Sequence, residues 1–256
     1  MRREFLINIV FLVTINLLIK PFYIFGIDRG VQNEVGPESF GLYWALFNFV
    51  YLFQVINDLG LQNFSATYIS QNRARSTKYF GHIASVKLLA SIVFSVLVTI
   101  VARIIGYGEL LWPLLSFLIF NQILISLISF LRANMAGLGN YRLDSFSSIL
   151  DRSFMILICG ILLWGVDIDF EIMHFVLAQT VSLSFTVVIL AFLLRRSLPS
   201  LRIKWHLPTL WTFVRKSAPY ALTFVLTTLY TRVDAVMLER LLVNGDHESG
   251  VYVSGF

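Results

Sequence analysis

The sequence predicts an all-α polytopic membrane protein, and three observations carry this prediction. The chain is 57% hydrophobic and 14% charged, whereas soluble domains carry about 25% charged residues. Its mean hydropathy is +0.76. The apolar residues form long blocks, close to the roughly 20 residues that cross a bilayer core, instead of the short alternating strands of a membrane β-barrel.

Seven apolar blocks predict seven membrane-spanning helices, and an eighth block begins at Gly250. They cover about residues 5–27, 40–61, 82–102, 110–131, 146–166, 172–194 and 217–238. The first block is too long for a signal peptide and no small-residue cleavage site follows it, so we interpret it as a retained span. Cys159 is the single cysteine and lies inside the fifth block, so no disulfide forms within one chain.

Basic residues in the loops predict a cytoplasmic N-terminus, because Lys and Arg set the orientation of short loops. With this threading two basic residues, Arg29 and Arg103, lie outside, and acidic residues such as Asp28 and Glu34 lie outside too. Thirteen basic residues lie inside: Arg2, Arg3, Arg73, Arg75, Lys78, Arg132, Arg142, Arg195, Arg196, Arg202, Lys204, Arg215 and Lys216. The positive net charge therefore reports topology, and we expect no nucleic-acid partner.

The loops are too short to form a catalytic domain. They contain no phosphate-binding glycine loop, no zinc-ligand spacing and no nucleophile elbow. We therefore expect no enzyme activity, no metal site and no cofactor. Whatever the protein does takes place within or between its helices.

Polar residues inside the spans are the candidate functional residues, because charge in a bilayer is costly and normally faces a protein interior or a wet cavity. In the first span Asn16, Lys20 and Tyr23 share one helical face, next to Pro21. We assign them to substrate binding. Similar stripes occur in the second and seventh spans: Tyr51, Gln54, Asp58 and Gln62, and Thr223, Thr227, Thr231 and Asp234, with Arg232 nearby.

Several of these residues have simpler interpretations. Ser, Thr, Asn and Gln commonly join neighbouring helices. Lys87 can extend its side chain toward the inner surface. Asp151 and Arg152 are expected near the inner surface, where a structural role is favoured.

The end of the chain resembles its beginning, which predicts a repeat. Residues 35–47 align with residues 244–256, matching Gly36, Gly41, Tyr43 and Phe47 to Gly245, Gly250, Tyr252 and Phe256. Six spans return the chain to the cytoplasm, so the second copy would run parallel to the first, as in some transporters. We divide the chain into a six-helix lobe (1–194), a basic interfacial linker (195–216) and the start of a second lobe (217–256).

The same segments resemble the polysaccharide biosynthesis, or Wzx-type lipid-linked oligosaccharide flippase, family of the MATE/MOP superfamily. The resemblance is carried by "FGLYWALF", "DLGLQNFSATYIS", "LRANMAGLGNYRLDS", "VRKSAPYALTFVLTTLYTRVDAVMLERLL" and "GVYVSGF". The motif positions would be Gly41 with Tyr43, residues 58–61, Pro219 and Asp234. The resemblance implies two six-helix lobes around a cavity and about twice this length, so we expect a fragment that ends just inside the second lobe.

The resemblance implies a flippase that moves a polyprenyl pyrophosphate-linked oligosaccharide across a prokaryotic inner membrane. Lys20 and Arg232 would then be counter-charges to the pyrophosphate. Asp58 and Asp234 would couple protons or cations, or pair with basic residues. Membrane lipids and the polysaccharide polymerisation machinery would be further partners. Two alternatives stay open, a MATE-type cation-coupled drug exporter and a non-transporting scaffold or inactive truncation.

Overall fold

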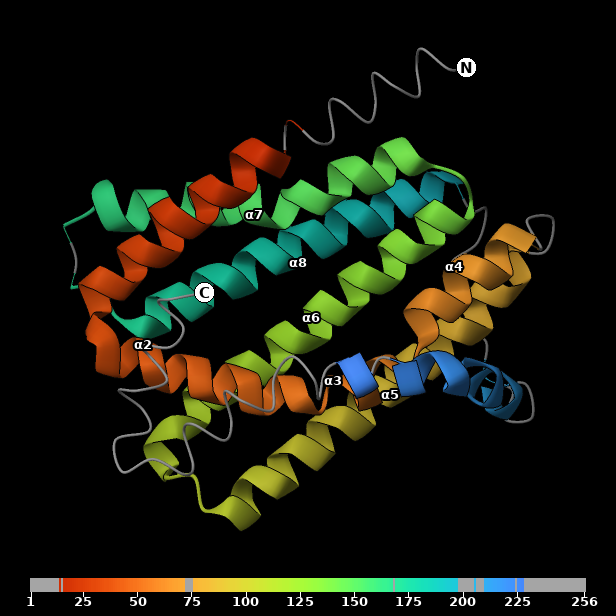
Figure 1. Ribbon diagram of the computed structural model, residues 1–256, viewed down its shortest axis with the longest axis horizontal. Helices are drawn as coiled ribbons and strands as arrows, with labels where there is room; N and C mark the ends of the chain where they lie inside the picture. Colours follow the sequence, from red (N-terminus) through yellow and green to blue (C-terminus); the bar gives the residue numbers. More distant parts are fainter. Residues whose placement is uncertain are drawn as a thin grey trace.

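The computed structural model is built from helices throughout the residues that it describes, and it confirms the all-α prediction (Figure 1). These residues are 14, 16–71, 76–167, 169–197, 205, 210–223 and 225–227. The elements are η1 (Tyr23–Asp28), α2 (Arg29–Leu52), α3 (Gln54–Asp58), α4 (Leu61–Gln71), α5 (Ser76–Ile105), η3 (Glu109–Leu111), α6 (Trp112–Gly137), α7 (Tyr141–Trp164) and α8 (Ile172–Ser197).

Four helices in the described part are long and apolar enough to cross a membrane, and a bent stretch, 16–52 with 54–71, adds a fifth candidate. The membrane interpretation also follows from side chains that the bundle leaves uncovered. Large apolar residues recur on α5 and α8 at the same helical spacing and stay exposed: Leu89, Val93, Val96 and Ile100, and Val181, Phe185, Val188 and Phe192. Such stripes suit contact with lipid tails.

The first helix ends later than the sequence predicts. We expected it to end near Ile27, but helical backbone continues to Gly36, where φ is 80° and ψ is 163° and the chain turns before Pro37. Between Tyr23 and Asp28 the helix is of the π type. Pro21 precedes this segment and has no backbone N–H to donate, which disturbs the regular hydrogen-bond ladder. Asp28 therefore lies on a helix and not in an outside loop.

The second predicted span, 40–61, is broken twice. The backbone departs from regular helix at Phe53, between α2 and α3, and turns at Leu59 and Gly60, which both have positive φ. The flanking helical stretches differ in direction by 47°. The residues of the predicted polar stripe consequently do not share one helical face. Gln54 and Asp58 are buried, whereas Gln62 is exposed.

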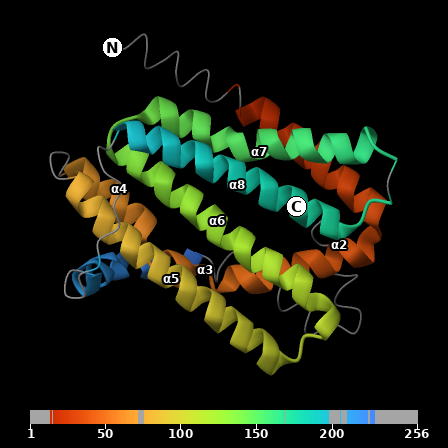
Figure 2. The same cartoon turned by 180° about the vertical axis from the view of Figure 1, so that it is seen from behind.

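Helix α6 is the centre of the bundle. It packs against α2, α3, α4, α5, α7 and α8. The opposite views show α8 running beside both α6 and α7, with α4 and α5 grouped at one end of the bundle (Figures 1 and 2). Two apolar clusters surround α6, one toward α2 and α8 and the other toward α4 and α5.

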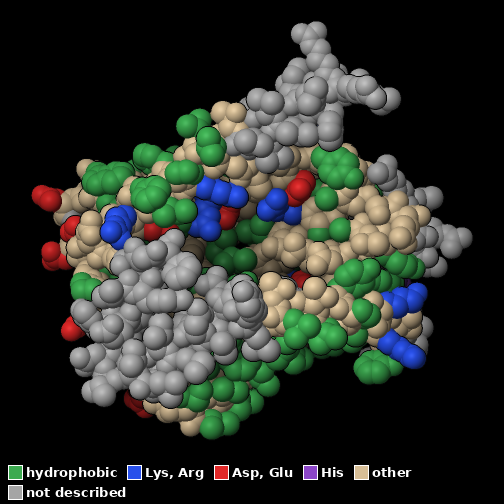
Figure 3. Space-filling view, viewed as in Figure 1, with side chains coloured by type: hydrophobic (Ala, Val, Ile, Leu, Met, Phe, Trp, Pro, Cys, Tyr) green, Lys and Arg blue, Asp and Glu red, His purple; other side chains and the backbone are tan. Residues whose placement is uncertain are grey.

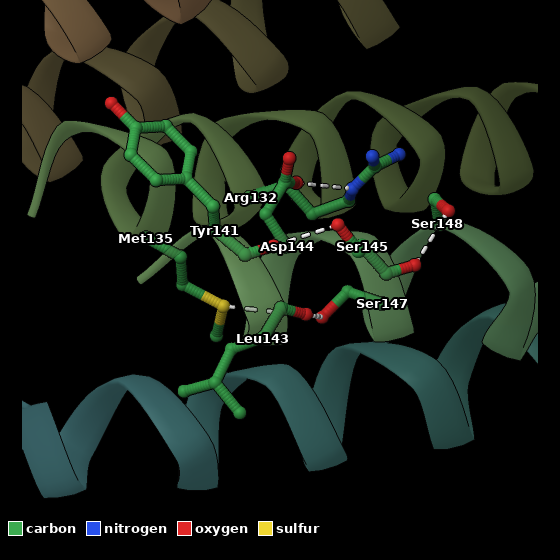
Figure 4. Close-up of polar contacts among 8 residues, drawn as sticks. All are labelled: Arg132, Met135, Tyr141, Leu143, Asp144, Ser145, Ser147 and Ser148. Carbon is green, nitrogen blue, oxygen red and sulfur yellow. Dashed lines mark hydrogen bonds and ion pairs between the residues drawn. The ribbon is translucent and has the colours of Figure 1, made fainter. Parts of the chain in front are cut away.

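The turn between α6 and α7 is held by polar contacts between the two helices (Figure 4). Arg132 on α6 donates from Nε to Asp144 Oδ1 on α7 at 2.9 Å. Asn140, just before α7, donates from Nδ2 to Ser197 Oγ at the end of α8, at 3.1 Å. These contacts tie three helix ends together on one side of the bundle.

The described residues 210–223 form a helix that packs against α4. Leu210 and Phe213 are buried. The Phe213 ring lies 5.8 Å from the Phe64 ring and 5.9 Å from the Tyr68 ring, between centroids. Residues 210–216 belong to the predicted linker, and here they continue directly into the seventh helix.

Candidate functional site

Two charged groups lie inside the helical bundle, and they differ in almost every respect. The first, called here the Arg152 cluster, consists of Tyr23, Asp28, Tyr43 and Arg152. The second, called the Lys87 network, consists of Gln54, Asn57, Asp58, Lys87, Ser91, Gln122 and Ser126. Each one places a basic side chain next to an acidic one.

In the Arg152 cluster the guanidinium lies on an aromatic face. Arg152 Cζ is 4.2 Å from the centroid of the Tyr23 ring, a cation–π contact between α7 and η1. Asp28 interacts electrostatically with Arg152 and through its side chain with Tyr23. The neighbouring Asp151 carboxylate is 3.8 Å from Arg152 Nε. The guanidinium is therefore oriented from several sides, but hydrogen bonds from the described residues do not enclose it.

Arg152 also remains accessible, with 42% of its side chain exposed. Figure 3 shows a recess near the middle of one face of the molecule, with basic and acidic side chains along its edge and apolar side chains at its floor. Within the described residues the guanidinium donates no hydrogen bond, so its N–H groups are available to a planar anion such as a carboxylate or phosphate.

A layer of uncharged polar residues supports the Arg152 cluster from behind. Tyr43 is buried and interacts with Gln179 through its side chain. Gln179 Oε1 accepts from Asn121 Nδ2 at 3.1 Å, and Thr180 Oγ1 donates to Asn121 Oδ1 at 2.8 Å. Side-chain contacts thus run continuously from the cluster across α2 and α8 to α6.

In the Lys87 network the basic side chain is enclosed. Lys87 is 1% exposed. Its Nζ donates to the Asn57 backbone oxygen at 2.7 Å, to Asn57 Oδ1 at 3.1 Å and to Ser126 Oγ. The three ammonium protons therefore all have acceptors, and the expected extension of Lys87 toward the inner surface is wrong. Helices α3 and α6 offer it oxygens inside the bundle instead.

The rest of the network fixes α3 against α5 and α6. Asn57 Nδ2 donates to the Gln122 backbone oxygen at 3.2 Å, and Ser91 Oγ donates to Asn57 Oδ1 at 2.9 Å. Asp58 is buried and interacts electrostatically with Lys87 and with the backbone N–H groups of Gln62 and Gly60. Its Oδ1 and both polar side-chain atoms of Gln122 have no hydrogen-bond partner in the described part of the chain.

The structure distributes the predicted site residues unevenly. Tyr23 is buried in the Arg152 cluster, Asn16 is partly exposed, and Lys20 is exposed. Asp58 lies in the Lys87 network, so the two predicted groups are in different parts of the lobe. Arg232 and Asp234 lie outside the described residues.

Sequence reasoning missed Arg152 and Asp28 as site residues. Arg152 was expected near the inner surface because the apolar block begins at Phe146. Helix α7, however, begins at Tyr141, which puts Arg152 at about the midpoint of its 24 residues. A basic residue followed by apolar residues, halfway along a helix of membrane-spanning length, is the signal that could have found it.

Comparison with solved structures shows the same fold in membrane transporters. A multidrug resistance MATE family transporter of the MOP superfamily matches in its outward-facing conformation with a TM-score of 0.66 and 17% identity, over 97% of this chain and 58% of that one. A MOP superfamily transporter from Pyrococcus furiosus Vc1, whose binding pocket is described as having reverse polarity, matches with a TM-score of 0.65 and 17% identity, over 97% and 57%. The chain thus spans less than three fifths of either structure's length.

The inward-facing conformation of a MATE family transporter matches equally well, with a TM-score of 0.66, 17% identity and coverage of 91% and 56%. The chain therefore has the helical fold seen in these MATE/MOP transporters. A search of curated proteins found no match. A family model for polysaccharide biosynthesis proteins matches residues 5–255, and the chain belongs to that family.

Proposed function

We propose that this chain forms the first six-helix lobe and the start of the second lobe of a flippase for lipid-linked oligosaccharides. The family membership and the transporter fold support a membrane transporter, and the partly exposed side chain of Arg152 supports an anionic substrate. The transported oligosaccharide would be attached to a polyprenyl pyrophosphate and would cross a prokaryotic inner membrane. The N-terminus of the chain would lie in the cytoplasm. The polymerisation machinery would receive the product.

The partly exposed side chain of Arg152, whose guanidinium donates no hydrogen bond within the described residues, is the observation that carries this proposal. A pyrophosphate is a doubly charged or more highly charged anion, and moving it through hydrocarbon is very costly without a counter-charge. Arg152 offers paired N–H donors that match phosphate oxygens. Stacking on Tyr23 keeps the guanidinium plane in place before the ligand arrives.

Asp28 has two roles in this proposal. It orients Arg152 while the site is empty, and it keeps the net charge of the cluster low enough for release. A site with an excess of positive charge would bind pyrophosphate too tightly to let it leave. Lys20, Asn16 and Arg232 remain proposed contacts to the same substrate, and Asp58 and Asp234 remain proposed coupling or ion-pairing residues.

A direct binding measurement tests the proposal. The protein is expressed from its full reading frame and purified. It is then titrated with a polyprenyl pyrophosphate and with the uncharged polyprenol of the same length. Arg152→Gln should weaken pyrophosphate binding about tenfold, the size of one charge-assisted contact, and leave polyprenol binding unchanged. Arg142→Gln is the matched control, because Arg142 is an exposed arginine on the same helix. Equal pyrophosphate affinity in Arg152→Gln and the unmodified protein would contradict the proposal.

The second candidate is a cation-coupled drug exporter, which the carboxylate of Asp28 favours. In that case a cationic dye binds at Asp28, and Asp28→Asn weakens dye binding while Arg152→Gln strengthens it. The pyrophosphate titration and the dye titration therefore give opposite results for Arg152. A non-transporting scaffold would bind neither probe.

A further inference from the structure

The break in the second span is the feature that the proposed function leaves unexplained. Between Phe53 and Gly60 the chain leaves regular helix twice, which frees backbone oxygens inside the bundle. Breaks at membrane depth occur only where the protein satisfies those groups. Here the Lys87 ammonium satisfies one of these oxygens, because it donates to the Asn57 backbone oxygen at 2.7 Å.

The same break forms the seat of the helix at residues 210–223. A Cβ atom placed on Gly60 would lie 2.4 Å from Ala221 N, 2.6 Å from Ser217 O and 2.8 Å from Tyr220 C. Backbone therefore meets backbone here, and only glycine permits the approach. Because φ at Gly60 is +70°, the turn itself also favours glycine.

Aromatic contacts extend this seat along α4. The Phe64 ring lies 6.3 Å from the Tyr220 ring, between centroids. Lys216 Nζ lies 5.6 Å from the centroid of the Tyr68 ring. The turn at Gly60 and the first two turns of α4 thus form one continuous contact with residues 213–221.

This seat adjoins the Lys87 network. Asn57, the residue that Lys87 holds by two atoms, is three positions before Gly60. Asp58, which interacts with Lys87 electrostatically, also interacts with the backbone N–H of Gly60. Only two residues of backbone therefore separate Asn57, which Lys87 holds, from the turn on which residues 217–221 rest.

We propose that Lys87 is a positioning residue for transport: its ammonium fixes the broken span in the shape that seats residues 217–221, and so sets the contact between the two lobes. Lys87 touches no substrate in this proposal. The buried ammonium, which belongs to α5, holds α3 and α6 together through its hydrogen bonds. The consequence for transport rests on the proposed function, whereas the consequence for the contact does not.

Cross-linking measures the contact directly. In a Cys159→Ser background, Tyr68→Cys with Lys216→Cys places two thiols across the seat, to be joined by a short bifunctional maleimide. Asn140→Cys with Ser197→Cys reports the intact first lobe, because these side chains meet at 3.1 Å away from the seat. Lys87→Met should lower the yield of the 68–216 cross-link several-fold and leave the 140–197 cross-link unchanged. Ser95→Ala is the matched control, since the Ser95 hydroxyl donates within α5, to Ser91 O.

The two yields separate a local effect from general misfolding. An unchanged 68–216 yield in Lys87→Met, with the 140–197 yield intact, would overturn the proposal. If Lys87→Met loses both cross-links, the decision passes to Ser126→Ala, which removes one acceptor of Lys87 and keeps the charge. That variant should lower the 68–216 yield alone, and an unchanged yield overturns the proposal. If the unmodified protein does not bind polyprenyl pyrophosphate, the proposed function is wrong, but the proposed role of Lys87 at the contact is unaffected.

Discussion

Lys87 and Arg152 are two basic residues inside the same bundle, but one is enclosed and the other is open. Lys87 is 1% exposed and donates to three oxygens. The Arg152 side chain is 42% exposed and rests on an aromatic ring. A basic group whose donors are all used cannot bind a ligand without first breaking its own contacts. Charge inside a membrane protein therefore indicates function only together with the number of donors left free.

Removing each charge in turn gives the largest expected difference between the two groups. Lys87→Met removes the donor to Asn57 and Ser126 and leaves the buried Asp58 without its nearby cation. Leaving buried polar groups without partners costs about 1–3 kcal/mol, and more for charged groups. Arg152→Met removes a half-exposed contact and should cost at most about 1 kcal/mol. Thermal unfolding of both variants in detergent micelles measures this. Equal losses of stability would mean that the distinction between an enclosed and an open cation is wrong.

The seat at Gly60 gives the next largest effect. Gly60→Ala forces a methyl group against backbone atoms of residues 217–221, which adds about 1–3 kcal/mol of overpacking to the strain of a positive φ. Gly106→Ala is the control, because φ there is +85° but nothing lies within 4 Å of the added Cβ. It should cost only about 1–2 kcal/mol, the strain of the left-handed backbone. Thermal unfolding should therefore give a lower midpoint for Gly60→Ala than for Gly106→Ala. Equal midpoints would mean that residues 217–221 do not rest on this turn.

The Tyr23 ring offers a way to examine the open cation more closely. Tyr23→Leu removes the aromatic face under Arg152 and should weaken binding of a polyprenyl pyrophosphate about 2- to 10-fold, the value of a cation–π contact of about 0.5–1.4 kcal/mol. Tyr23→Phe retains the ring and should bind nearly as well as the unmodified protein. Weak binding by both variants would instead assign the effect to the Tyr23 hydroxyl and its interaction with Asp28.

The spans were predictable from the sequence because apolar block length is a local property. The observed helices α5, α6, α7 and α8 contain the blocks predicted for them, except that the fourth and fifth blocks begin or end up to two residues outside α6 and α7. Helix ends were less predictable, since a helix continues past the apolar block into polar residues such as Tyr141–Ser145. That extension is why Arg152 was expected near the surface.

The two breaks in the second span were not predictable in the same way. Their stability depends on partners that are distant in the sequence, such as Lys87 for Asn57, 30 residues away, and Ala221 for Gly60. No periodicity within residues 40–61 contains these partners. The predicted role of Asp58 in coupling or ion pairing stays a prediction, while its proximity to Lys87 is something only the folded chain brings about.

The ion pair between Arg132 and Asp144 should give the smallest effect. Its side chains are partly exposed, so it tests whether an ion pair in contact with water is weaker than the enclosed contacts of Lys87. Nε and Oδ1 are 2.9 Å apart, closer than many buried pairs, yet the side chains are 32% and 28% exposed. Water screens the pair and competes for both groups, so distance alone does not determine its strength. A double-mutant cycle with Arg132→Ala and Asp144→Ala should give a coupling energy of about 0.2–1 kcal/mol, measured by thermal unfolding. High salt should reduce it further, whereas the cost of Lys87→Met should hardly change with salt, because buried charges are screened much less. A coupling energy for Arg132 and Asp144 as large as the loss in Lys87→Met would show that geometry matters more than enclosure in this protein.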